Sequence, residues 1–91
     1  MRYKVGFKEQ AREDLARLFH DEPKAYKKAI SLIGELYDHP RTGTGKPEQL
    51  KGAHSAIWSR RITRKHRLIY EIQEHEIIVL VLTAYGHYGD K

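Results

Sequence analysis

Three side chains in this sequence are of the types that could cleave RNA without a bound metal ion. RNA carries its own nucleophile, the 2′-hydroxyl, so an enzyme needs a base for that proton and an acid for the leaving 5′-oxygen, with cations for the phosphate charge. Glu48 is the only carboxylate between residues 41 and 67 and could serve as the base. Arg67 offers a planar guanidinium for the phosphate. His87 could serve as the acid, because an imidazole exchanges protons near neutral pH.

Two tyrosines lie on either side of His87 in the terminal stretch "TAYGHYGDK". Tyr85 and Tyr88 could stack on an unpaired base, as aromatic side chains do in proteins that bind single-stranded RNA. A purely structural interpretation is also open at this point. In it, Glu48 pairs with a lysine of its own loop, Arg67 is a surface cation of a strand and Tyr88 packs against the core.

The positive charge of the chain is concentrated in its middle third. The formal net charge is +5, yet residues 41–67 alone contain eight lysines and arginines against one acid. Such a block favours a partner that carries phosphates, because neutralising phosphates releases bound counterions. The alternative is a solvated face that only keeps the protein soluble.

Several other classes of site find no support. The chain has no cysteine, which excludes disulfides and thiolate metal sites. Its six histidines form no compact ligand pair and are interpreted mostly as isolated surface residues, so we predict no metal site and no cofactor. The glycines of "RTGTGKPEQ" lack the Walker pattern. No apolar run reaches the roughly 20 residues of a membrane helix, and no signal peptide is visible, so we expect a cytoplasmic protein without a membrane partner.

The first forty residues predict one strand and two helices. Tyr3, Val5 and Phe7 alternate as in a short strand. Residues 8–20 place Ala11, Leu15, Leu18 and Phe19 on one helical face, and a second helix follows, with Asp21 or Glu22 as its cap and Pro23 in its first turn. The buried positions predicted for the second helix are Tyr26, Ile30, Ile33 and Tyr37. Only a few residues separate the helices, so they should form a hairpin.

Three strands should follow a loop over residues 41–52. "AIWSRRI" and "HRLIYEI" alternate in polarity, and "EIIVLVLTAY" is a nearly continuous apolar run typical of a central strand. Short turns connect them. The fold class predicted for residues 1–91, taken as one domain, is α+β with the order β-α-α-β-β-β. An antiparallel sheet would carry the helical hairpin on one face, leaving Arg60, Arg67 and the end of the last strand on the other.

Three blocks of sequence closely resemble the YoeB/Txe branch of the RelE-like toxins of bacterial toxin–antitoxin modules. They are "GTGKPEQLKG", "IWSRRITRKHRLIYEI" and the terminal "AYGHY", in the family's order and spacing. The resemblance is strong from residue 43 to residue 88, and the preceding residues agree in pattern. It implies a RelE-like fold, which agrees with the order of elements above.

The resemblance also implies an activity and a set of site residues. The family activity is that of an mRNA interferase, a ribosome-dependent endoribonuclease that cuts mRNA in the 30S A site and so inhibits translation. Glu48 matches the general base, Arg67 the transition-state cation, His87 the general acid, and Tyr88 a residue that orients the nucleotide. Residues expected to hold mRNA or ribosomal RNA are Lys46, Lys51, Arg60, Arg61 and Tyr85.

The family also implies partners, and the sequence departs from it in three places. A Phd/YefM-type antitoxin should bind the basic surface with an acidic tail, and operator DNA should be contacted only through that complex. The free chain could be a monomer or a homodimer. The departures are the terminal Gly89-Asp90-Lys91, two cations in the turn "TRK", and Gly86 before His87.

Two alternatives to cleavage remain at this stage. One is a RelE-like module that binds the ribosome without cutting. The other is a small basic domain that acts mainly as an antitoxin-dependent operator co-repressor.

Overall fold

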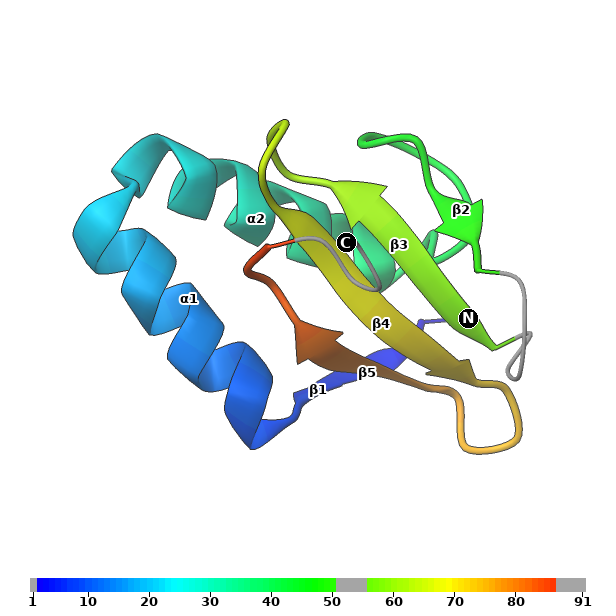
Figure 1. The fold of residues 1–91 in the computed structure, drawn as a ribbon. Helices are drawn as coiled ribbons and strands as arrows, with labels where there is room; N and C mark the ends of the chain where they lie inside the picture. The colour runs from blue at the N-terminus through cyan, green and yellow to red at the C-terminus, as the bar shows by residue number, and fades with distance from the viewer. Residues whose placement is uncertain (1, 51–55, 87–91) are drawn as a thin grey trace.

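The fold combines two helices with a five-stranded sheet (Figure 1). The computed structural model describes residues 2–50 and 56–86. In chain order the elements are β1 (Lys4–Phe7), α1 (Glu9–Asp21), α2 (Pro23–Leu36), β2 (Glu48–Gln49), β3 (Ile57–Arg61), β4 (Arg67–Gln73) and β5 (Ile78–Thr83). The predicted α+β, RelE-like class is confirmed, and the expected loop over residues 41–52 contains one additional short strand, β2.

The sheet is mixed rather than wholly antiparallel. Its strand order is β1-β5-β4-β3-β2, and the consecutive strands β3, β4 and β5 pair antiparallel, as predicted from their short turns. β1 instead pairs parallel with β5, with Val5 opposite Val79. The two helices lie between β1 and the rest of the sheet in the sequence, and this long connection allows the parallel pairing.

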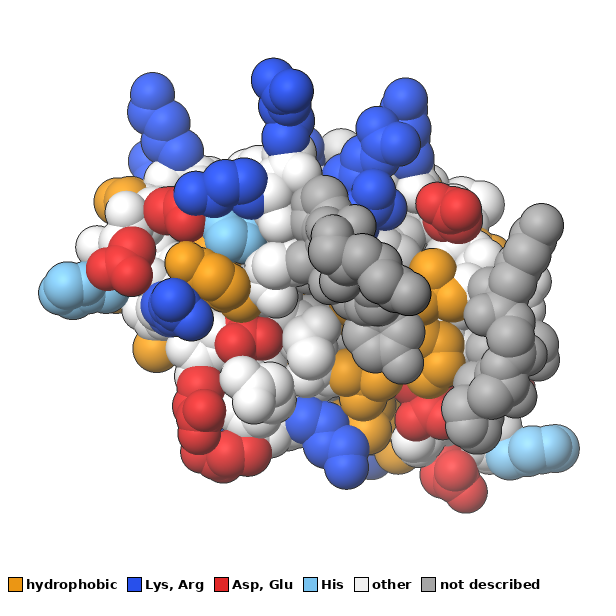
Figure 2. Space-filling view, viewed as in Figure 1, with side chains coloured by type: hydrophobic (Ala, Val, Ile, Leu, Met, Phe, Trp, Pro, Cys, Tyr) orange, Lys and Arg blue, Asp and Glu red, His pale blue; other side chains and the backbone are white. Residues whose placement is uncertain are grey.

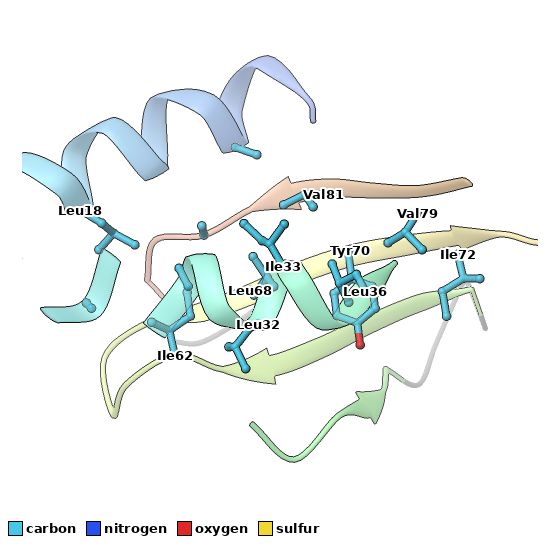
Figure 3. Packing of buried hydrophobic residues seen from close by; sticks show 14 residues of the cluster. Leu18, Leu32, Ile33, Leu36, Ile62, Leu68, Tyr70, Ile72, Val79 and Val81 are labelled. Carbon is cyan, nitrogen blue, oxygen red and sulfur yellow. The ribbon is translucent and has the colours of Figure 1, made fainter. Parts of the chain in front are cut away.

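Both helices cover the same face of the sheet, and the core lies between the helices and that face (Figure 3). Leu18 of α1 is fully buried, as are Tyr70 of β4 and Val81 of β5. Alternation along the strands therefore sends every second side chain of β4 toward the helices. The apolar residues that α2 contributes to the core are Ala25, Ala29, Leu32, Ile33 and Leu36.

The helical faces differ in part from those predicted. Phe19 is 65% exposed and Ile30 is 43% exposed, so neither belongs to the core. Both residues lie at the border of the buried face of their helix. The buried face of α2 includes the small residues Ala25 and Ala29, whereas the sequence pattern predicted the larger neighbours Tyr26 and Ile30. Glu22 stands at the cap position of α2, but its side chain makes no capping hydrogen bond. In the described part of the chain, no helix is long and apolar enough to cross a membrane.

Candidate functional site

The face of the sheet opposite the helices brings Glu48, Arg61 and Arg67 together. Arg61 of β3 is directly opposite Arg67 of β4, and Glu48 of β2 is opposite Ser59, two residues before Arg61. Residues two apart on a strand share a face, so the three side chains project on the same side. Strand spacing places the Cα atoms of Glu48 and Arg67 about 12 Å apart with Arg61 between them, a span that these long side chains can close around one phosphate.

The end of the described chain lies beside Arg67. The backbone N–H of Arg67 donates a hydrogen bond to the carbonyl of Gly86 over 2.9 Å. Two residues earlier, the N–H of Ala84 donates to Oδ2 of the buried Asp14 over 2.9 Å. The chain beyond β5 is therefore tied to the sheet and to α1 as far as Gly86, the last residue that the structure describes.

A positively charged pocket lies at this corner of the open face. It has a volume of about 380 Å³ and is lined by Arg61, Thr63, Arg64 and Arg67. Lys and Arg side chains gather along the same edge of the molecule, over the β3–β4 turn and the loop before β2 (Figure 2). Guanidinium groups bind phosphate through paired hydrogen bonds, so the pocket is suited to a phosphodiester.

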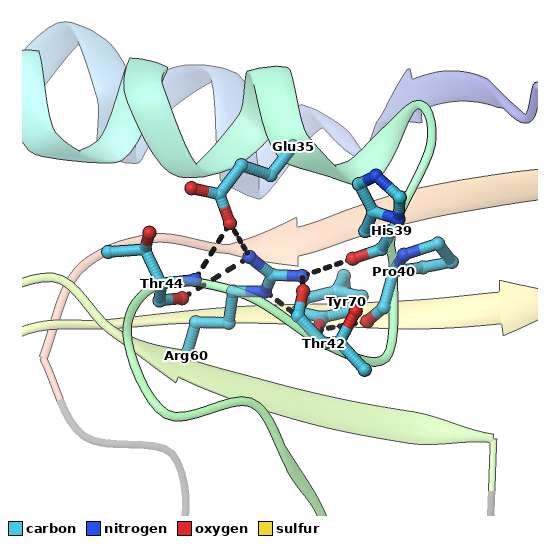
Figure 4. Close-up of polar contacts among 7 residues, drawn as sticks. All are labelled: Glu35, His39, Pro40, Thr42, Thr44, Arg60 and Tyr70. Atoms are coloured by element: carbon cyan, nitrogen blue, oxygen red, sulfur yellow. Dashed lines mark hydrogen bonds and ion pairs between the residues drawn. The ribbon is translucent and has the colours of Figure 1, made fainter.

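The loop that precedes Glu48 is held by Arg60, whose side chain is completely buried (Figure 4). Its guanidinium donates to the carbonyls of His39, Thr42 and Thr44 and to Oε1 of Glu35, the last over 2.6 Å. Arg60 also donates through Nε to the Tyr70 hydroxyl. One buried cation therefore shapes the loop that leads into β2 and Glu48.

Hydrogen bonds and burial within this network shift the pKa values of two ionisable groups. Hydrogen bonds from Thr44, and then from the Arg60 guanidinium, hold the pKa of Glu35 below its ordinary value. Burial raises the pKa of the Tyr70 hydroxyl, which donates to the carbonyl of Pro40 over 2.7 Å. Glu35 is therefore ionised beside Arg60 at neutral pH, and Tyr70 is neutral.

Two of the predicted RNA-binding residues occupy other positions than expected. Arg60 was expected on the open face, but it points toward α2, and all its described donors are directed at protein groups. Arginine is assigned to the surface by default, yet here alternation sends Arg61 outward and Arg60 inward. Tyr85 packs against the core, with its ring 4.3 Å from the His66 ring and 4.0 Å from the Arg17 guanidinium, so its aromatic surface is engaged within the protein.

The remaining predicted residues divide into two groups. Lys46 is exposed on the loop before β2, next to Gly45, whose carbonyl accepts a 2.7 Å hydrogen bond from the Arg61 N–H. Lys51, His87 and Tyr88 lie outside the described residues. Across residues 2–50 and 56–86, no group of three or more histidines and carboxylates is placed to hold a metal ion. The catalytic roles of Glu48, Arg67, His87 and Tyr88 stay predictions.

Sequence reasoning missed a buried histidine at this site. His66 is 2% exposed and contacts both Glu22, at the start of α2, and Gly86, at the end of the described chain. It had been grouped with the surface histidines. Its position directly before Arg67 was the one available signal, whereas its partners are 44 and 20 residues away in the sequence.

Comparisons with known proteins agree with this arrangement. A family model described as the YoeB-like toxin of bacterial type II toxin–antitoxin systems matches residues 7–88. The toxin YoeB of Mycobacterium bovis is 40% identical over 84 residues, which cover 92% of this chain and 96% of the relative. Among solved structures, a YoeB/ParE toxin from Agrobacterium tumefaciens superposes with a TM-score of 0.85 at 30% identity, covering 93% of this chain and 99% of the other.

A third relative has been solved in two assemblies. YoeB of Staphylococcus aureus superposes as a dimer with a TM-score of 0.82 and in its complex with YefM with a TM-score of 0.78. In both, identity is 30% and the match covers 97% of this chain and 100% of the other. The fold, the arginine-lined open face and these matches together show that the chain belongs to the YoeB-like toxins of bacterial type II toxin–antitoxin systems.

Proposed function

We propose that this toxin is a ribosome-dependent endoribonuclease that cleaves mRNA in the ribosomal A site by metal-free general acid–base catalysis. The observation that carries the proposal is the row formed by Glu48, Arg61 and Arg67 on the sheet face opposite the helices, with Gly86 hydrogen-bonded at its end. A nucleotide lying along this row would have a carboxylate on one side, two guanidiniums at its phosphate and Gly86, the end of the described chain, on the other side.

The reaction follows from these positions. Glu48 takes the proton from the 2′-hydroxyl, whose oxygen attacks the neighbouring phosphorus, and the bond from phosphorus to the 5′-oxygen breaks. His87 gives its proton to that leaving oxygen, so the products are a 2′,3′-cyclic phosphate and a 5′-hydroxyl. Arg61 and Arg67 stabilise the negative charge that develops on the phosphorane oxygens. Tyr88 orients the nucleotide, and Lys46 and Lys51 hold the flanking RNA.

The decisive experiment compares Arg67→Ala with the wild-type chain on programmed ribosomes. The hydrogen bond from Arg67 to Gly86 is made by the backbone, so an alanine keeps it and removes only the guanidinium. We expect cleavage in the A-site codon to slow about 100-fold, with ribosome binding retained. Arg12→Ala, an exposed arginine of α1, is the matched control and should cut normally.

Other outcomes would support a different function. If wild-type protein arrests translation while the mRNA stays intact, the toxin is a non-cleaving binding module. If it has no effect on translation but represses with its antitoxin, it is an operator co-repressor. Undiminished cutting by both Arg67→Ala and His87→Ala would contradict the assigned roles. Because the substrate is translating mRNA, the proposed place of action is the cytoplasm.

The proposed protein partner is a Phd/YefM-type antitoxin. YoeB of Staphylococcus aureus has been solved in complex with YefM, and the same protein has been solved as a dimer. An acidic antitoxin segment laid over Arg61, Arg64 and Arg67 would exclude mRNA by occupying the same pocket. Operator DNA would then be contacted through the antitoxin. Sedimentation of the free chain would decide between a monomer and a homodimer.

A further inference from the structure

The buried His66 ring joins Glu22, the N-cap residue of α2, to the end of the described chain. Its Nε2 atom lies 2.8 Å from Oε2 of Glu22, and its Nδ1 atom lies 2.9 Å from the backbone nitrogen of Gly86. Both ring nitrogens are therefore occupied, on opposite sides of the imidazole. The backbone around the ring is fixed as well, since Thr63 accepts from the N–H groups of Lys65 and His66 and donates its own N–H to the His66 carbonyl.

These two contacts determine the protonation state of the ring. A backbone N–H can only donate, so Nδ1 must be the acceptor and carries no proton. The single proton of the neutral imidazole is then on Nε2 and is donated to the Glu22 carboxylate. Glu22 thereby selects the tautomer that leaves Nδ1 available to Gly86, in the way that a carboxylate commonly orients a histidine.

Both backbone polar groups of Gly86 make hydrogen bonds. Its N–H donates to His66, and its carbonyl accepts from the N–H of Arg67, each over 2.9 Å. Its φ of +75° lies in the left-handed region, which glycine adopts freely but does not prefer, so the hydrogen bonds rather than glycine itself fix this turn.

We propose that His66, oriented by Glu22, is a positioning residue: it holds Gly86, the residue directly before the proposed acid His87 in the sequence. The inference rests on the proposed function, in which His87 is the acid. Misplacing a catalytic group by about 1 Å can slow a reaction about 100-fold, so one hydrogen bond at this point has a large effect on rate.

The contact to Gly86 requires Nδ1 to carry no proton, because a proton there would turn the acceptor into a donor. The charged groups that face the ring come from each element packed against it. Glu22, the N-cap of α2, contacts it directly, Lys65 of the β3–β4 turn lies 3.6 Å from the same carboxylate oxygen, and Arg17 of α1 lies across the Tyr85 ring. Asp14, also on α1, binds the N–H of Ala84 close by.

Two substitutions separate the contact to Gly86 from the contact to Glu22. The side-chain oxygen of asparagine stands at the same number of bonds from Cβ as Nδ1, so His66→Asn keeps an acceptor for Gly86 and loses the contact to Glu22. Glutamine matches Nε2 in the same way, so His66→Gln keeps a donor to Glu22 and loses the acceptor. Both variants remove the ring and its packing against Tyr85, so a merely structural role would weaken them equally.

The experiment measures amide hydrogen exchange of Gly86 and single-turnover cleavage on saturating ribosomes. With His66→Gln we expect Gly86 to exchange about tenfold faster and cleavage to slow by about 10- to 100-fold. With His66→Asn both should stay within a few-fold of the wild type.

The outcomes separate this inference from the proposed function. Equal loss of cleavage in both variants, or unchanged exchange at Gly86 in His66→Gln, would overturn the positioning role. If the wild type does not cut mRNA at all, the proposed function fails, while exchange at Gly86 still decides whether His66 holds the chain end.

Discussion

The two sides of the candidate site are held by two buried cationic or ionisable side chains of different chemistry. On the Glu48 side, Arg60 donates to three carbonyls, a carboxylate and a hydroxyl. On the Gly86 side, His66 makes one hydrogen bond as donor and one as acceptor. Arginine stays charged at every accessible pH, whereas the role of His66 depends on its being neutral.

The difference indicates which side of the site is easier to displace. The Arg60 network is enclosed by α2 and by the loop of residues 39–46, and losing one bond leaves several others in place (Figure 4). The Gly86 side depends on single bonds near the end of the described chain, from Asp14, His66 and Arg67. Segments with few bonds open locally at a lower free energy. We therefore expect the Gly86 side to be displaced more easily than the Glu48 side.

The largest effect that we expect from this comparison is that of Arg60→Leu. It removes the buried cation that donates to Glu35 and to three loop carbonyls, so we expect the free energy of unfolding to fall by about 3 kcal/mol. Urea denaturation in a His87→Ala background measures it. Arg61→Leu, at the next position and exposed, should change the same quantity by no more than about 0.5 kcal/mol. Equal effects of the two substitutions would contradict the anchoring role of Arg60.

Glycine substitutions should distinguish the Glu48 side of the site, through Gly43 in its loop, from the Gly86 side. At Gly43, with φ +118°, an added Cβ would lie 2.3 Å from Oε1 of Glu35, so Gly43→Ala combines backbone strain with a displaced Glu35. At Gly86 the added Cβ meets nothing within 4 Å, so Gly86→Ala carries backbone strain alone. We expect losses of about 2–3 and about 1 kcal/mol, measured by thermal unfolding. The reverse order would mean that the Gly86 turn is the tighter of the two.

Much of the fold followed from periodicity, because alternation and helical spacing are local properties of a sequence. They predicted the strands β1, β3, β4 and β5 and both helices. They could not predict the two-residue strand β2, which exists only through its pairing with Trp58 and Ser59. Nor could they predict that β1 pairs with β5, since that contact joins opposite ends of the chain.

The site divides in the same way. Motif residues such as Glu48 and Arg67 were found from type and order, and the structure places them on one face. Arg60 was misplaced because alternation gives two faces without saying which one is buried, and a charged residue favours the exposed assignment. His66 was missed because its burial depends on Glu22, which is distant in sequence and had been interpreted as a helix cap.

We expect the smallest effects from replacing the carboxylates of Glu35 and Glu22, which pair with Arg60 and His66. Hydrogen bonds from Thr44 and then Arg60 lower the pKa of Glu35, and the hydrogen bond from His66 lowers that of Glu22, both from an ordinary 4.5. A lowered pKa in the folded state means that each carboxylate stabilises the protein above about pH 4.5, and that this contribution is lost as the pH falls through the lowered value.

Replacing either carboxylate by glutamine should therefore matter at neutral pH and not in acid. At pH 7 we expect Glu35→Gln to cost about 1 kcal/mol of unfolding free energy and Glu22→Gln to cost less, because Glu22 pairs with a neutral ring. Melting temperatures measured from pH 7 to pH 3 should show both variants converging on the wild type below pH 4.5. Glu13→Gln, an exposed residue of α1, is the control and should follow the wild type throughout. If Glu22→Gln were the more costly change, the Gly86 side would be the firmer anchor and the comparison would be reversed.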